Sequence, residues 1–106
     1  MALRLLVCRR QDVPPESCLA FEVDGLDWPV LVAQVGGRFY ATTSECPHEE
    51  VSLEGGRRSG TRIECPGHGY IFDLATGACD HDPHLCLRRY RVSFDGDDLY
   101  VDLISF

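Results

Sequence analysis

Two short segments that each pair a cysteine with a histidine constrain this chain more than any other feature of its sequence. Cys46 and His48 lie in the first, spaced C-P-H. After a spacer of 16 residues, Cys65 and His68 lie in the second, spaced C-P-G-H. A proline follows each cysteine directly, and glycines flank the second histidine. Thiolate and imidazole are both metal ligands, so the pattern predicts two loops that together offer two sulfur and two nitrogen donors.

Two kinds of metal centre use such a donor set. A structural zinc is held by it tetrahedrally, but zinc modules usually take both cysteines from one turn and both histidines from another. Here each loop is mixed, and mixed loops of this kind resemble those of Rieske proteins, in which both cysteines bind one iron and both histidines bind the other. The resemblance implies one Rieske-type 2Fe–2S cluster on Cys46, His48, Cys65 and His68. A zinc-stabilised interaction module stays as the alternative.

The charge of such a cluster indicates its task. Two ferric ions, two sulfides and two thiolates sum to a formally neutral oxidised cluster, which becomes singly negative on reduction. Four thiolates would leave both states more negative, so histidine ligation raises the reduction potential from about −400 mV to roughly −150 to +300 mV. The expected function is therefore one-electron transfer at moderate potential. In Rieske proteins the histidine ligands face solvent, which makes His48 and His68 the expected exit for the electron.

Beyond the candidate ligands, the chain resembles bacterial Rieske ferredoxins of aromatic ring-hydroxylating dioxygenase systems along nearly its whole length. This family implies a carrier, not an enzyme, that takes electrons from an NAD(P)H-dependent flavin reductase and passes them to a terminal oxygenase in aromatic hydrocarbon catabolism. A Rieske subunit of another oxidoreductase, of the diiron monooxygenase or nitrite reductase type, is the second reading. The matching segments are Gly37–Ala41 before Cys46, Ile63–Pro66, His68–Asp73 with Thr76-Gly77, and Tyr90–Val92 before a final hairpin.

Devices that raise the potential in other Rieske proteins are missing from this sequence. Members that work in respiratory and photosynthetic complexes carry an extra cysteine in each ligand loop, and serine and tyrosine hydroxyls beside the cluster. The corresponding positions here hold Gly67, Tyr70 and Phe72. We therefore expect a potential near the low end of the range, about −150 mV.

The length and the net charge of the chain indicate its domain number and the kinds of partner that it can bind. At 106 residues the chain fits a single domain, residues 1–106, with a cluster-binding subdomain at about residues 45–84. The net charge of −7 would repel nucleic acid and anionic membranes and would attract basic surfaces of protein partners. No signal peptide or membrane span is visible, so we expect a cytoplasmic protein.

The rest of the sequence predicts an all-β fold, an antiparallel sandwich or barrel-like base that carries the small subdomain. Many short runs rich in β-branched and aromatic residues are bounded by turn residues such as Gly36-Gly37, Thr76-Gly77 and Asp95-Gly96-Asp97. One helical turn is expected at Gln11–Pro15, where two prolines stop its growth. The predicted strands are Leu3–Val7, Cys18–Val23, Val30–Val35, Arg38–Thr42, Arg62–Glu64, Tyr70–Asp73, Arg89–Phe94 and Leu99–Leu103.

Several other residues near the motif carry weaker expectations. Backbone N–H groups around Gly67 and Gly69 are expected to point at the sulfides. Cys8 and Cys18 are expected to be small core residues, and Cys79 and Cys86 free thiols. His81 and His84 either form a pH-dependent interface or are inert loop residues. Apolar cover for the cluster is expected from Pro47, Val51, Leu53, Tyr70 and Pro83.

Overall fold

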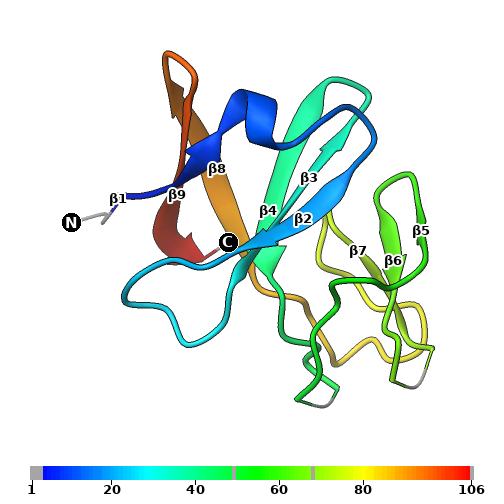
Figure 1. Cartoon of the computed structure of the whole chain (residues 1–106). Coiled ribbons are helices and arrows are strands. Elements are labelled where there is room, and N and C mark those ends of the chain that lie inside the picture. The colour runs from blue at the N-terminus through cyan, green and yellow to red at the C-terminus, as the bar shows by residue number, and fades with distance from the viewer. Residues whose placement is uncertain (1–3, 49, 68, 106) are drawn as a thin grey trace.

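A six-stranded antiparallel sheet forms the larger part of the molecule. The computed structural model describes residues 4–48, 50–67 and 69–105, with the backbone alone for residues 103–105. The strand order is β1-β9-β8-β4-β3-β2, and the sheet curls into a half-barrel (Figure 1). A 3-10 turn, η1 (Arg10–Asp12), follows the first strand. The strands are β1 (Arg4–Arg9), β2 (Cys18–Phe21), β3 (Val30–Val35), β4 (Arg38–Thr43), β8 (Arg89–Asp95) and β9 (Asp98–Ser105).

A second, smaller sheet is inserted between β4 and β8 of the chain. It contains β5 (Arg58–Ser59), β6 (Arg62–Glu64) and β7 (Ile71–Asp73), paired antiparallel in that order. The segment that follows β4 and the connection between β6 and β7 both run to the same end of the molecule, at the bottom of Figure 1. These two connections carry the predicted ligands.

Strand β3 is the wall that the two halves of the core share. Val30, Leu31, Val32 and Ala33 are all buried, and since side chains alternate along a strand, neighbours in this run face opposite sides of the sheet. Val30 and Val32 pack into one cluster, and Leu31 and Ala33 into the other. The first cluster, the base core, also contains Cys8, Val13, Val23, Ala41, Tyr90, Leu99 and Val101. The second, the loop core, also contains Cys46, Leu53, Ile63, Cys65, Phe72, Leu74, Cys79 and Leu87.

The all-β prediction is confirmed, and most strand bounds lie close to the predicted ones. Val30–Val35 and Arg62–Glu64 are identical, while the other predicted strands differ by one or two residues at one or both ends. The helical turn lies at Arg10–Asp12, one residue before the predicted start. Strand β5 was missed because a two-residue strand is too short to show an alternating pattern.

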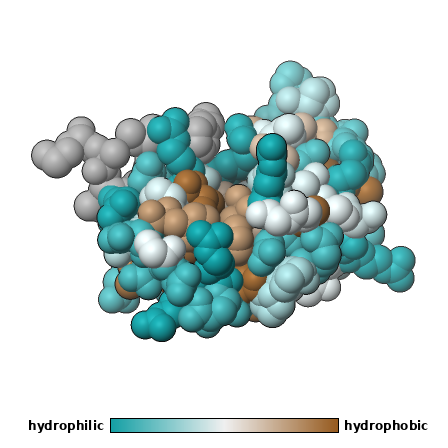
Figure 2. All heavy atoms as spheres, turned by 90° about the horizontal axis from the view of Figure 1, so that it is seen from above, coloured by the Kyte–Doolittle hydropathy of each residue, from teal (hydrophilic) through white to brown (hydrophobic). Residues whose placement is uncertain are grey.

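The end of the molecule opposite the two connections has a different character. Seen from above, its surface is mainly hydrophilic, with apolar side chains gathered toward the middle (Figure 2). Within the described residues, no helix has the length and apolarity that crossing a membrane would need.

Candidate metal centre

The first candidate ligand loop is the tip of a small hairpin that follows β4. Glu45 and Ser52 form its last bridge, and the Cys46 N–H donates a hydrogen bond to the Val51 carbonyl at 2.9 Å. The Leu53 N–H donates to the Ser44 carbonyl at 2.7 Å and continues the pairing on the other side. Cys46 is thus held at the base of a four-residue tip, residues 47–50.

The second candidate ligand loop has the same construction between β6 and β7. Glu64 pairs with Ile71, and the Cys65 N–H donates to the Tyr70 carbonyl at 2.7 Å. The Gly69 N–H donates back to the Cys65 carbonyl at 3.0 Å, with Gly69 at φ 76°, a value that glycine adopts without strain. Cys65 is therefore also held at the base of a four-residue tip, residues 66–69.

The two tips place their cysteines in equivalent positions. In both, the cysteine is the residue directly after the last bridged pair, and its N–H bonds to the carbonyl five residues later. Cys46 and Cys65 are each 1% exposed and both pack into the loop core. His48 lies within its own tip and is half-buried, whereas His68 lies outside the described residues. The described part of the donor set is thus two buried thiols and one imidazole nearer the surface.

Stacked rings bring the two tips together. The ring of His48 in the first tip stacks on the ring of Tyr70 at the end of the second, with centroids 3.9 Å apart and an angle of 23° between the planes. Stacked aromatic pairs contribute about 0.5–1.5 kcal/mol beyond the area that they bury. The contact ties the two loops to each other, as a shared metal centre requires.

The cysteines outside the two tips differ in position from Cys46 and Cys65. Burial is the main cause that raises the pKa of the Cys8 thiol to about 11, with Asp12 adding to it. Burial likewise raises the pKa of the Cys18 thiol to about 11, against a smaller opposing effect of Arg58. Both thiols therefore stay protonated at neutral pH. Cys8 is buried in the base core, as predicted, whereas Cys18 is only half-buried against the loop core. Cys79 and Cys86 carry free thiols, as predicted.

The strand pairing explains why Cys79 and Cys86 do not form a disulfide. Ala78 lies opposite Cys86 in an isolated bridge, and Phe72 lies opposite Cys79 in another. Adjacent residues on an extended segment point to opposite faces, so Cys79 faces the loop core while Cys86 lies on the exposed side with Ala78. The two sulfur atoms thus leave the backbone in divergent directions.

Three of the five side chains predicted to cover the site lie in or against the loop core. Leu53 is fully buried, and Val51 and Tyr70 pack against the loop core as half-buried side chains. Pro47 and Pro83 are exposed in the structure and do not belong to either core. The prediction for the N–H group of Gly69 was wrong, because that group closes its own loop on Cys65.

Sequence reasoning gave His81 no fixed role, yet the structure places it against the site. Its ring stacks on Tyr70 with centroids 5.2 Å apart and planes at 18°. The sequence signal was its place in a loop near the motif, but neither spacing nor residue type indicated the contact. His84, three residues further on, is exposed.

The described residues fit an iron–sulfur centre. Thiolates are soft ligands that suit iron–sulfur clusters, and here both lie in an apolar, largely water-excluded core. The imidazole of His48 is a suitable ligand for a second iron. The described residues hold no group of three His, Cys, Asp or Glu side chains placed to bind one metal ion. In this donor set each iron would take two protein ligands.

Comparison with known proteins agrees with this geometry. Residues 4–91 match the model of the Rieske [2Fe-2S] domain. The chain is 37% identical over 98 residues, 92% of its length and 90% of the relative's, to the ferredoxin component of biphenyl 2,3-dioxygenase from Rhodococcus jostii (strain RHA1). It is 32% identical, over an alignment of 107 positions, to the ferredoxin subunit of 3-phenylpropionate/cinnamic acid dioxygenase from Escherichia coli (strain K12), covering 94% of this chain and 93% of the relative.

A solved structure shows the same similarity in three dimensions. One chain from the complex of reduced oxygenase and oxidized ferredoxin in carbazole 1,9a-dioxygenase superposes with a TM-score of 0.85 at 32% identity. The superposition covers 97% of this chain and 95% of that one. The likeness thus extends over nearly the whole chain.

Proposed function

Because the chain belongs to the Rieske [2Fe-2S] domain family, we propose that it is the ferredoxin of an aromatic ring-hydroxylating dioxygenase system, an electron carrier and not a catalyst. Its relatives are ferredoxin components of a biphenyl and a phenylpropionate dioxygenase, with 32–37% identity over more than nine-tenths of the chain. The residues 1–106 are proposed to form one domain, with residues of about 45–84 as its cluster-binding part. These two relatives serve different substrates, so the resemblance leaves the aromatic compound open.

Four residues are proposed to hold the cluster, Cys46 and Cys65 on one iron and His48 and His68 on the other. The group itself would supply reversible one-electron redox chemistry. The single observation that carries this assignment is the equivalent placement of Cys46 and Cys65 at the bases of two matching tips. The loop core around both sulfurs shields that side from water, and His48 lies closer to the surface than either cysteine.

Electrons are proposed to enter from an NAD(P)H-dependent flavin reductase and to leave to a terminal oxygenase, through the histidine side of the centre. The first supporting observation is the similarity to a chain from a complex of oxygenase and ferredoxin. The second is the acidic charge of −7, which suits basic patches on protein partners and makes association salt-sensitive. Both partners and this chain are proposed to work in the cytoplasm.

A reconstituted electron-transfer chain tests this function. The protein with its cluster is mixed with NADH, a candidate reductase and a candidate oxygenase with its aromatic substrate, and the hydroxylated product is measured. We expect product formation that depends on this chain and is lost in the Cys65→Ser variant. A cluster that is reduced by the reductase but fails to support any dioxygenase, while supporting a diiron monooxygenase or a nitrite reductase, would favour the second reading. A colourless, zinc-containing protein would contradict both.

A further inference from the structure

Tyr70 stacks with two histidine rings that come from different loops. His48, from the first tip, lies 3.9 Å from it, and His81, from the segment between β7 and β8, lies 5.2 Å from it, both as centroid distances. Both histidine planes are within 23° of the phenol plane. A set of nearly parallel rings, the ring stack of His48, Tyr70 and His81, thus runs from a candidate ligand to an exposed side chain.

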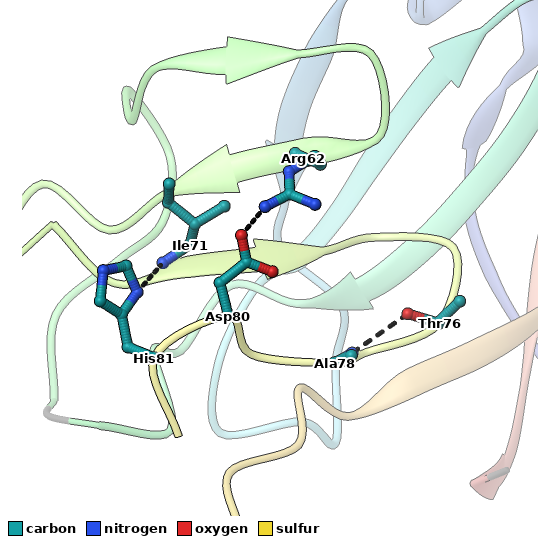
Figure 3. A network of polar contacts seen from close by, with 6 residues as sticks. All are labelled: Arg62, Ile71, Thr76, Ala78, Asp80 and His81. Carbon is teal, nitrogen blue, oxygen red and sulfur yellow. Dashed lines mark hydrogen bonds and ion pairs between the residues drawn. The ribbon is translucent and has the colours of Figure 1, made fainter. Parts of the chain in front are cut away.

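The loop that carries His81 is fastened to the small sheet. The Asp80 N–H donates to the Ile71 carbonyl at 2.9 Å, and the Asp80 carboxylate forms an ion pair with Arg62 of β6 (Figure 3). Cys79 bridges to Phe72 of β7. These contacts fix the backbone directly before His81, so the position of its side chain is set by the sheet.

A hydrogen bond then orients the His81 ring itself. The Ile71 N–H donates to Nδ1 of His81 at 3.4 Å, and Figure 3 shows the ring turned toward that backbone group. Since Nδ1 accepts, the neutral ring carries its proton on Nε2. Fixing an exposed histidine in one rotamer costs side-chain conformational entropy. Here the ring stack and the hydrogen bond offset that cost.

Resting on the proposed function, in which His48 is an iron ligand, we propose that His81 is a positioning residue that holds this ligand in place through Tyr70. The phenol ring covers part of the His48 imidazole and fixes its plane, and His81 in turn fixes the phenol. Interactions behind a ligand set its orientation, and solvent exposure is one of the factors that set a cluster's potential. His81 therefore acts on the centre without touching it.

The direction of the effect follows from charge. The reduced state is the more negative one, and water stabilises it more than an apolar ring does. If the stack loosens, water reaches the His48 ring and reduction becomes easier. Removal of His81 should therefore raise the reduction potential and change the EPR line shape of the reduced protein.

Three substitutions at His81 and one nearby control make the test. His81→Ala removes both the ring and the acceptor, His81→Asn keeps an acceptor without the ring, and His81→Phe keeps the ring without the acceptor. His84→Ala is the matched control, because His84 is an exposed histidine of the same loop. Each variant is purified with its cluster, checked by far-UV circular dichroism, and measured by redox titration and EPR of the reduced state.

We expect a positive shift of the potential for His81→Ala and His81→Asn, near-complete rescue by His81→Phe, and no shift for His84→Ala. Tyr70→Leu should shift the potential at least as far as His81→Ala, because it removes the middle ring. A potential and spectrum of folded His81→Ala that equal those of the wild type would overturn the inference and leave the proposed function intact. A wild-type protein that binds no 2Fe–2S cluster, or binds it without histidine, would overturn both.

Discussion

The base core and the loop core both bury their side chains, yet only the loop core contains candidate metal ligands. The base core is lined by aliphatic side chains from long, paired strands, with Leu99 and Val101 fully buried at its centre. The loop core is enclosed by short strands and by the two hairpin tips, and it contains Cys46 and Cys65. The first stabilises the fold, and the second positions donors at its edge.

Burial alone does not separate a ligand cysteine from a structural one. Cys79 packs into the same loop core as Cys46 and Cys65, and Cys8 lies in the base core. The two candidate ligands differ by their place at the base of a hairpin tip that also contains a histidine. Position in a closed loop, and not hydrophobic environment, distinguishes these thiols as candidate ligands.

The largest predicted effect separates these two kinds of buried cysteine. Cys65→Ser should abolish the cluster, because a serine hydroxyl is a poor replacement for a thiolate ligand, whereas Cys79→Ala in the same core should retain it. Iron, acid-labile sulfide and visible absorption per chain measure the outcome. Equal loss of iron in both variants would mean that packing, not ligation, governs cluster binding.

Two fully buried leucines test whether the cores fail independently. Leu53→Ala in the loop core and Leu99→Ala in the base core should each lower the free energy of unfolding by about 2–5 kcal/mol. In denaturant, Leu53→Ala should lose visible absorption before its far-UV circular dichroism changes, whereas Leu99→Ala should lose both together. If Leu99→Ala also lost its visible absorption before its far-UV circular dichroism changed, the stability of the site would depend on both cores.

Two glycines provide a smaller contrast of the same kind. A Cβ on Gly56 would overlap the carbonyl oxygen of Glu64, next to Cys65, whereas a Cβ on Gly96, in the β8–β9 turn at φ 61°, would meet no atom within 4 Å. Gly56→Ala should cost about 1–3 kcal/mol and speed cluster loss. Gly96→Ala should cost about 1–2 kcal/mol from backbone strain and leave cluster lifetime unchanged. Thermal melts and bleaching rates at fixed temperature compare the two.

The smallest effect concerns thiols outside the site. Because burial raises the pKa of Cys18 to about 11, its alkylation by iodoacetamide near pH 8 should be much slower than that of exposed Cys86. Mass spectrometry of timed samples resolves the two sites.

The raised pKa values of Cys8 and Cys18 in the folded state also make the free energy of unfolding depend on pH. Their contribution to stability is fully present below the ordinary thiol pKa and is lost as the pH rises toward about 11. If the thiol of Cys18 were alkylated as fast as that of Cys86, the raised pKa of Cys18 would be contradicted.

Local patterns in the sequence were enough to predict every strand except β5 and to single out the candidate ligands. The run Val30–Ala33 is apolar throughout because β3 is buried on both faces, and the Gly36-Gly37 pair marks the turn that follows it. The C-P-H and C-P-G-H spacings predicted two ligand-bearing loops, and the structure shows both loops as hairpin tips. These features depend on neighbours in sequence, so a single chain displays them.

Contacts between distant segments were beyond the same reasoning. The stack of His81 on Tyr70 depends on how the segment after β7 folds back over β6 and β7, which the Asp80–Arg62 ion pair helps to fix. The use of the Gly69 N–H within its own loop depends on the tip conformation, not on residue type. Neither leaves a periodic or compositional trace in the sequence.

Electron-nuclear double resonance on the reduced protein, grown with ¹⁵N-histidine, tests the central claim most directly. Two mixed loops that share one 2Fe–2S cluster predict strong coupling of the unpaired electron to two histidine nitrogens, with two irons per chain. Loss of one of these couplings in His48→Cys would assign it to the first tip. Absence of nitrogen coupling in a protein that contains iron and sulfide would contradict the mixed ligation on which the whole account depends.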